Sequence, residues 1–143
     1  MTRPVTSTRN RMAAAFIATL TLALAAPVAA LPPLSQNVHV NDSLIQARVA
    51  DVLRRGCPSL DARMIRAFNE ARKLKRYALD QGYSEEQIDA FLDSREERQR
   101  IYREADRYMV ENGVVNGQPE TFCQLGRQEI ARKTIAGSLL VAR

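Results

Sequence analysis

The sequence has few of the residues that build metal and redox sites: it contains one His, two Cys and no Trp in 143 residues. A structural zinc site takes four ligands, usually Cys and His, so the three present exclude a Cys/His zinc cluster. No apolar run reaches 18 residues, which excludes a protein with several membrane spans. Charged residues make up 26% of the chain beside an ordinary apolar content of 45%, and this balance excludes a wholly disordered chain. A chain of this length favours one compact domain.

No acidic residue precedes Asp42. Three arginines at positions 3, 9 and 11 precede an apolar run over residues 12–26, and Pro27 and small residues follow as far as Ala30. This order is typical of a secretory signal peptide, with cleavage expected between Ala30 and Leu31. As a helix the run would span about 22 Å, short of the ~30 Å hydrocarbon core. The pattern therefore favours a cleaved signal over the alternative, a retained membrane anchor.

Two further absences refine this prediction of export. Asn10 separates Arg9 from Arg11, so there is no twin-arginine pair for export of a prefolded protein. No Cys follows the expected cleavage point, where a lipid-anchored bacterial protein would need one. We therefore expect a soluble product in the periplasm or the medium.

Removal of residues 1–30 changes the charge of the protein. The whole chain carries 21 basic and 16 acidic residues, a net charge of +5, and three of the basic residues lie in the predicted signal peptide. The remaining 113 residues carry 18 basic and 16 acidic side chains, a net charge of +2. A general attraction to nucleic acid or to anionic membrane loses most of its support at this value.

Helical spacing dominates the rest of the chain. Paired prolines at positions 32 and 33 disfavour helix, so residues 31–40 are expected to form an extended lead-in. Asn41, Asp42 or Ser43 can cap the first helix, and no alternation typical of a strand follows. The expected helices cover residues 41–56, 59–81, 84–93, 94–112 and a stretch from Pro119 onward. The sequence thus predicts an all-α fold, a compact bundle of about five helices in one domain over residues 41–143.

Local signals add detail to these helices. Ser84 and Gln87 have the spacing of a capping box at the start of the third helix. Gly126 and Gly137 either weaken the last helix or permit close contact with a neighbouring element. The apolar residues of the second helix are expected to face the core; they are Leu60, Met64, Phe68, Ala71, Leu74 and Ala78.

The two cysteines, Cys57 and Cys123, lie 66 positions apart. An even cysteine count in an exported chain favours a disulfide, which would join the junction of the first two helices to the start of the last. For this span the loop-entropy estimate is about 4 kcal/mol, a large share of the ~5–15 kcal/mol typical of a domain. The alternatives are free thiols, or a reactive Cys57 ahead of a helix N-terminus. Redox chemistry lacks support, because there is no C-x-x-C motif and the only histidine, His39, lies in the lead-in.

The densest basic cluster lies on the second expected helix and consists of Arg72, Lys73, Lys75 and Arg76, with Arg63 and Arg66 upstream. Arg72 and Arg76 are neighbours on one helical ridge. The cluster is a candidate surface for an anionic partner, such as a phosphate-bearing envelope polymer or an acidic protein. The alternative is the solvated back of an amphipathic helix, which we favour because neither interleaved aromatic residues nor a Gly-rich phosphate loop accompany the cluster.

Four carboxylates, Glu85, Glu86, Asp89 and Asp93, are the candidates for acid–base chemistry. Glycoside cleavage requires two carboxylates about 5–9.5 Å apart, one of them with a raised pKa. Glu85 and Glu86 are already explained by their place in the first turn of a helix, where the helix dipole favours negative charge. A calcium site is disfavoured because the spaced ligand loop is missing.

Several short stretches, taken in order, resemble a domain-of-unknown-function family, whose members are small exported proteins from Gram-negative bacteria. They are LPPL at 31–34, ARVAD at 47–51, CPSL at 57–60, ARMIRAF at 62–68, LKRYA at 74–78, GYSE at 82–85, IDAFL at 88–92, FC at 122–123 and GR at 126–127. The resemblance covers essentially residues 31–140. It implies export, a shared helical fold and two cysteines, and it implies no activity and no site residues.

These observations favour a non-enzymatic exported protein that binds or stabilises an envelope partner, either a protein or an anionic polymer. The alternative is a small cell-envelope hydrolase that uses carboxylates around Glu85–Asp93. We expect no metal, no cofactor, no nucleic-acid partner and no membrane span in the mature form.

Overall fold

The computed structural model describes residues 30–143, so the predicted signal peptide lies outside the described residues except for Ala30. The described residues form six α-helices, one 3-10 turn and two short strands, which confirms the predicted all-α class. In chain order the elements are η1 (Leu34–Gln36), α1 (Val38–Gly56), β1 (Leu60–Ala62), α2 (Met64–Asp80), α3 (Glu85–Asp93), α4 (Arg95–Glu111), α5 (Pro119–Arg132), α6 (Ile135–Ser138) and β2 (Leu140–Ala142).

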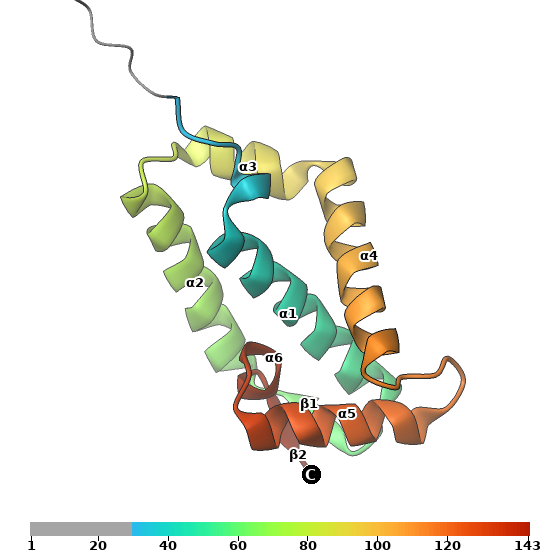
Figure 1. Ribbon diagram of the computed structural model, residues 1–143. Helices are drawn as coiled ribbons and strands as arrows, with labels where there is room; N and C mark the ends of the chain where they lie inside the picture. Colours follow the sequence, from blue (N-terminus) through green and yellow to red (C-terminus); the bar gives the residue numbers. More distant parts are fainter. Residues whose placement is uncertain (1–29) are drawn as a thin grey trace, which may run out of the picture.

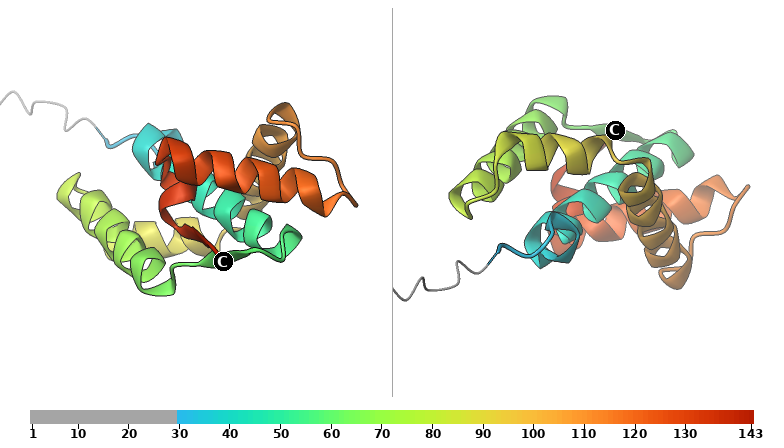
Figure 2. Two further views of the ribbon diagram at one scale, coloured as in Figure 1. Left: turned by 90° about the horizontal axis from the view of Figure 1, so that it is seen from below. Right: turned by 90° about the horizontal axis from the view of Figure 1, so that it is seen from above.

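Helix α1 runs through the middle of the molecule, and the other long helices surround it (Figure 1). Helices α2 and α4 lie on either side of it, α3 connects them across one end, and α5 crosses the other end next to α6. The views in Figure 2 place α2 and α3 in one layer and α5 in another, with α1 between the layers. Helix α1 is therefore enclosed, whereas α2 lies at the edge of the molecule.

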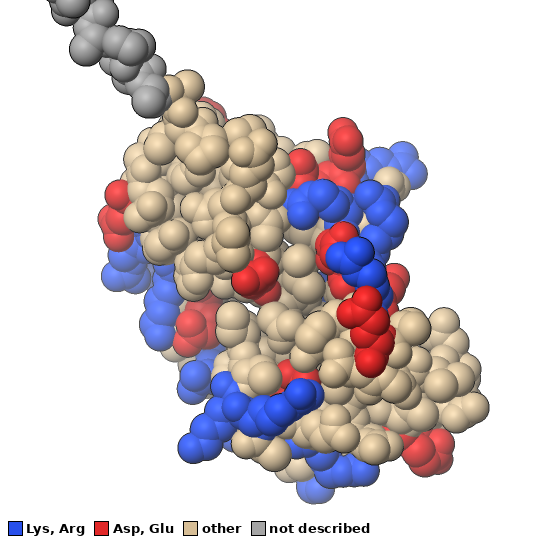
Figure 3. Space-filling model, in the orientation of Figure 1, with Lys and Arg blue, Asp and Glu red and all other residues tan. Residues whose placement is uncertain are grey.

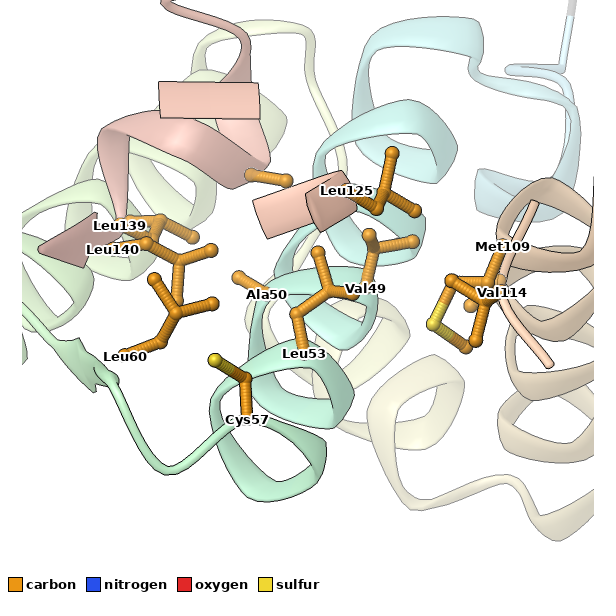
Figure 4. Close-up of a cluster of buried hydrophobic side chains, with 12 residues drawn as sticks. Val49, Ala50, Leu53, Cys57, Leu60, Met109, Val114, Leu125, Leu139 and Leu140 are labelled. Carbon is orange, nitrogen blue, oxygen red and sulfur yellow. The ribbon is translucent and has the colours of Figure 1, made fainter. Parts of the chain in front are cut away.

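The main core cluster forms where α1 meets α4, α5 and the C-terminal segment (Figure 4). Val49 and Leu53 of α1 are fully buried against Leu125 of α5 and Leu140 of β2. Burial of one such side chain contributes about 1.5–3 kcal/mol, so this cluster fixes α1 as the axis of the fold. A second cluster holds the opposite end of the molecule together and consists of Leu34, Val40, Ala78, Tyr83 and Ile88.

The lead-in is shorter than expected, because α1 begins at Val38 and not after residue 40. The side chain of Asn37 accepts a hydrogen bond from the backbone N–H of Val40 and thereby caps the helix. Asn41, one of the expected caps, lies inside the helix and donates to the carbonyl oxygens of Leu34 and Asn37. The lead-in is thus tied back onto α1, and Leu34 is buried.

The second helix also begins later than expected, at Met64 instead of Ser59. The residues between form β1, which pairs antiparallel with β2, so that Leu60 lies opposite Ala142. The backbone N–H of Arg63 donates to the carbonyl oxygen of Leu139, which continues this connection into α2. Strands of three residues are too short to show a periodic pattern, and their partners lie about 80 residues apart.

The last expected helix is divided in two. Lys133 has a left-handed backbone with φ of +55°, which ends α5, and Thr134 caps the short α6 that follows. The predicted close contacts at the two glycines are present: a Cβ at Gly137 would collide with the backbone of Glu129, and a Cβ at Gly126 would collide with the side chain of Leu60. Glycine thus allows α6 and β1 to press directly on α5.

Candidate functional site

Cys57 and Cys123 lie at disulfide-bond distance, with their sulfur atoms 2.01 Å apart. Cys57 is the fully buried residue that ends α1, and Cys123 lies in the first half of α5. The pair joins the two helices that the sequence analysis expected it to join. No free cysteine is present in residues 30–143, so this part of the chain offers no thiol for the redox alternative.

Helix α2 carries all four residues of the predicted basic surface, but the structure divides them. The Lys75 ammonium lies 3.1 Å from Glu85 and 3.8 Å from Asp89, and the hydrogen bond to Glu85 raises the pKa of Lys75. Lys73 pairs with Glu70 on the same helix at 3.1 Å. Within the described part of the chain, Arg72 and Arg76 make no ion pair and are left to face solvent.

The first two turns of α2 expose three large apolar side chains. Met64 is 69% exposed, Ile65 is 81% exposed and Phe68 is 63% exposed. The expectation that Met64 and Phe68 face the core was therefore wrong, whereas Leu74 and Ala78 do pack in the second core cluster. Periodicity identifies the apolar side of a helix but not whether another element reaches it. Here no described element covers the start of α2.

We call the solvent side of this helix the outer face of α2; it consists of Met64, Ile65, Arg66, Phe68, Arg72 and Arg76. The guanidinium of Arg72 lies 5.3 Å from the centre of the Phe68 ring, in a cation–π contact. A shallow hollow of about 850 Å³ follows the helix here. All of its lining residues come from Arg63 and α2 itself, so no second element forms an opposing wall. The apolar and basic groups of the outer face are therefore available together.

Charge is unevenly distributed over the fold. Residues 63–76 contain six basic residues and one acidic residue, Glu70, which gives this segment a net charge of +5. The remainder of residues 30–143 contains 12 basic and 15 acidic residues, a net charge of −3. Figure 3 shows basic side chains along the left edge of the molecule, where α2 runs in Figure 1. The small net charge of residues 31–143 is therefore the sum of one basic helix and an otherwise acidic domain.

The four candidate carboxylates lie on α3 and are all exposed. Glu85 and Asp89 face Lys75, and the pKa of Glu86 is lowered by hydrogen bonds from its own backbone N–H and from the Ser84 hydroxyl. The predicted capping box between Ser84 and Gln87 is present. A glycosidase acid needs a raised pKa in a cleft. This arrangement gives the hydrolase alternative no support.

A buried carboxylate, Glu129 on α5, went unnoticed in the sequence. It is fully buried and accepts hydrogen bonds from the Tyr108 hydroxyl at 2.8 Å, the Arg132 guanidinium at 2.6 Å and the Thr134 hydroxyl. Burial and the bond to Glu129 raise the pKa of Tyr108. The donors balance the buried charge and join α4, α5 and α6, so the cluster is structural. The sequence predicts only that Glu129 lies in a helix; it does not indicate that the side chain is buried.

A separate apolar groove of about 400 Å³ lies between α1 and α2. Small residues, among them Ala47, Ala67 and Ala71, form part of its walls, and Ile135 and Leu139 complete its lining. Helix α2 itself separates the groove from the outer face. In the part of the chain that the structure describes, no group of three His, Cys, Asp or Glu side chains could hold a metal ion. Residues 30–143 also contain no helix long and apolar enough to cross a membrane.

Comparison with known sequences identifies the family. Residues 32–141 match DUF5333, which is described as a family of unknown function. The chain belongs to DUF5333. The match spans every element from η1 to α6 and the first two residues of β2, so it includes the outer face of α2. No curated protein and no solved structure matches the chain.

Proposed function

We propose that this protein is an exported, non-enzymatic binding module of the cell envelope, which docks on an anionic partner through the outer face of α2. The observation that carries the proposal is the exposure of Met64, Ile65 and Phe68 beside arginines that have no acidic partner in the described residues. Apolar groups grouped on a surface mark interaction sites more often than single ones do.

The composition of the outer face supports an interaction with a partner that is both anionic and partly apolar. Arg72 already lies over the Phe68 ring, and arginine can stack on an aromatic face while its guanidinium binds a carboxylate or a phosphate. The three aliphatic and aromatic side chains would release water when covered, at about 25 cal/mol per Å² of apolar area. Charge complementarity would then provide specificity for the partner, and burial of apolar area would provide affinity.

Export is supported by two features of the chain. The expected cleavage point between Ala30 and Leu31 precedes every described element, so loss of residues 1–30 would leave the fold complete. Disulfides persist in oxidising compartments and are rare in the cytosol, and Cys57 and Cys123 lie at bonding distance. Both features fit a protein that works outside the cytoplasm.

Photo-crosslinking in cells tests the proposal. A photoreactive amino acid would replace Asn69, which is exposed on α2 and lines the hollow between the arginines. The matched control replaces Gln99, which is exposed on α4. We expect an irradiation-dependent adduct from position 69 and none from position 99. Equal yields from both positions, or no adduct from either, would count against the outer face as the binding surface.

A further inference from the structure

We infer that the anionic partner of the outer face of α2 is the surface of a phospholipid bilayer with anionic headgroups. The inference rests on the proposed function and narrows it to one class of partner. It follows from three properties of the outer face: its combination of apolar and basic residues, the lack of an opposing wall among the described residues, and its place on an otherwise acidic domain.

The outer face carries both kinds of group that an interfacial helix uses, apolar side chains and arginines, in successive turns of α2. Met64, Ile65 and Phe68 project from the first two turns, and Arg72 and Arg76 continue the same side of the helix. In an interfacial helix the apolar side chains enter the boundary between headgroups and acyl chains to a depth of about 5–10 Å, while arginines remain with the phosphates. A guanidinium matches phosphate geometry and pairs with two oxygens at once.

The shape of the surface favours a bilayer over a folded protein. The hollow along α2 is bounded by residues of one helix and its preceding residue alone, so it has no opposing wall to grip a peptide or a second helix. Specific protein interfaces rely on packing that resembles a protein interior. A fluid bilayer needs no such complementarity, because lipids rearrange around any convex apolar group.

The charge distribution would orient the protein on this surface. Residues 63–76 carry a net charge of +5, and the rest of residues 30–143 carries −3. An anionic surface would therefore attract α2 and repel the remainder of the domain. Each Lys or Arg near an anionic membrane strengthens binding by about fivefold. Arg66, Arg72 and Arg76 together would account for an increase on the order of a hundredfold.

Vesicle binding tests the inference. Residues 31–143 contain every described helix and both core clusters, so this chain, purified with its disulfide formed, is the protein to use. Its sedimentation with vesicles of phosphatidylglycerol and phosphatidylcholine is compared with its sedimentation with phosphatidylcholine alone. We expect binding to the anionic vesicles and little to the neutral ones. The difference should shrink at 1 M salt, where the Debye length falls to about 3 Å.

Two pairs of variants identify the surface that binds. The double variant Arg72→Gln/Arg76→Gln should bind anionic vesicles about 30-fold less tightly, and Ile65→Ser/Phe68→Ser should lose more than about tenfold. The matched controls remove the same kinds of group from α4. Arg95→Gln/Arg103→Gln replaces two exposed arginines that make no ion pair in the described residues. Val110→Ser replaces an apolar side chain that is 67% exposed. All of the substituted side chains are exposed, so the variants should unfold at the temperature of the parent protein.

The possible results separate the inference from the function on which it rests. Equal binding to neutral and anionic vesicles, no binding to either, or an equal loss in the α4 controls would overturn the bilayer as the partner. A protein adduct at position 69 in the crosslinking experiment would also overturn it, while leaving the outer face as a binding surface. A lipid adduct at position 69, together with the expected vesicle binding, would support both.

Discussion

Reduction of the disulfide between Cys57 and Cys123 should lower the stability of the fold by about 4 kcal/mol. The bond closes a loop with a sequence separation of 66 residues, and loss of the crosslink restores about this much chain entropy to the unfolded state. Reduction keeps both side chains, and Cys57 lies buried beside Leu53 and Leu60 in the main core cluster, so little packing energy is lost. Because a domain of this size has a total stability of about 5–15 kcal/mol, the reduced protein should be close to unfolding.

Urea titrations of residues 31–143, followed by circular dichroism with and without reductant, measure this difference. We expect a lower midpoint after reduction, and a midpoint of thermal unfolding lower by about 15 °C, since 1 kcal/mol corresponds to roughly 4 °C in a domain of this size. The control is Cys57→Ala/Cys123→Ala, whose stability should not respond to reductant. A change of less than about 1 kcal/mol in the parent protein would refute the loop-entropy argument, and two alkylatable thiols before reduction would show that the bond does not form.

Two further predictions concern α5 and its neighbours. Gly137→Ala should destabilise the fold by about 2 kcal/mol or more, since its methyl group meets the backbone of Glu129; Gly126→Ala should have a smaller effect, because it meets only a side chain that can move. Equal unfolding midpoints in urea for the two variants would contradict this order. The raised pKa of Tyr108 means that the folded chain holds a proton that the unfolded chain releases above pH ~10, so stability falls as pH rises through this range. The stability of Tyr108→Phe should fall less between pH 9 and 11 than that of the parent protein. At pH 7 the variant should be less stable by about 1–3 kcal/mol, because Glu129 loses a donor. Parallel profiles of stability against pH for the two proteins would exclude this role for the hydroxyl.

Local signals in the sequence predicted local structure well. The capping box at Ser84, the capped start of α4 at Ser94 and the first position of α5 at Pro119 are all present in the structure. Each of these features depends on residues within one turn of the helix, so its physical cause is contained in a few neighbouring positions. The disulfide was predictable for a different reason, because the chain offers only one pair of cysteines.

Features that depend on distant parts of the chain were not predictable in this way. Leu60 follows helical spacing, but its backbone pairs with Ala142, near the C-terminal end of the chain, and forms a strand. Phe68 lies on the apolar side of its helix, yet no element within residues 30–143 packs over it. Glu129 resembles a surface residue, yet its carboxylate is fully buried. Two of its donors, Arg132 and Thr134, are close in the chain, but the third, Tyr108, comes from α4. In each case the environment of the residue, and not its type, decides its role.

The basic cluster shows what the structure adds to a prediction about function. The sequence placed Arg72, Lys73, Lys75 and Arg76 together and favoured a solvated helix back. The structure neutralises the two lysines with carboxylates and leaves Arg72 and Arg76 beside exposed apolar side chains. The signal that was missed is the combination of this charge with Ile65 and Phe68 on the same side of α2.

The absence of Trp from the sequence allows the most direct measurement of where the protein binds. Phe68→Trp places a single indole on the outer face of α2, and Val110→Trp places one on α4 at a similar exposure, 67% against 63%. On addition of vesicles of phosphatidylglycerol and phosphatidylcholine, we predict that the emission of the Trp at position 68 shifts to shorter wavelength and is quenched by brominated lipid, while that of the Trp at position 110 does not change. An unchanged spectrum at position 68, or the same shift at both positions, would contradict docking of the protein on a bilayer through α2.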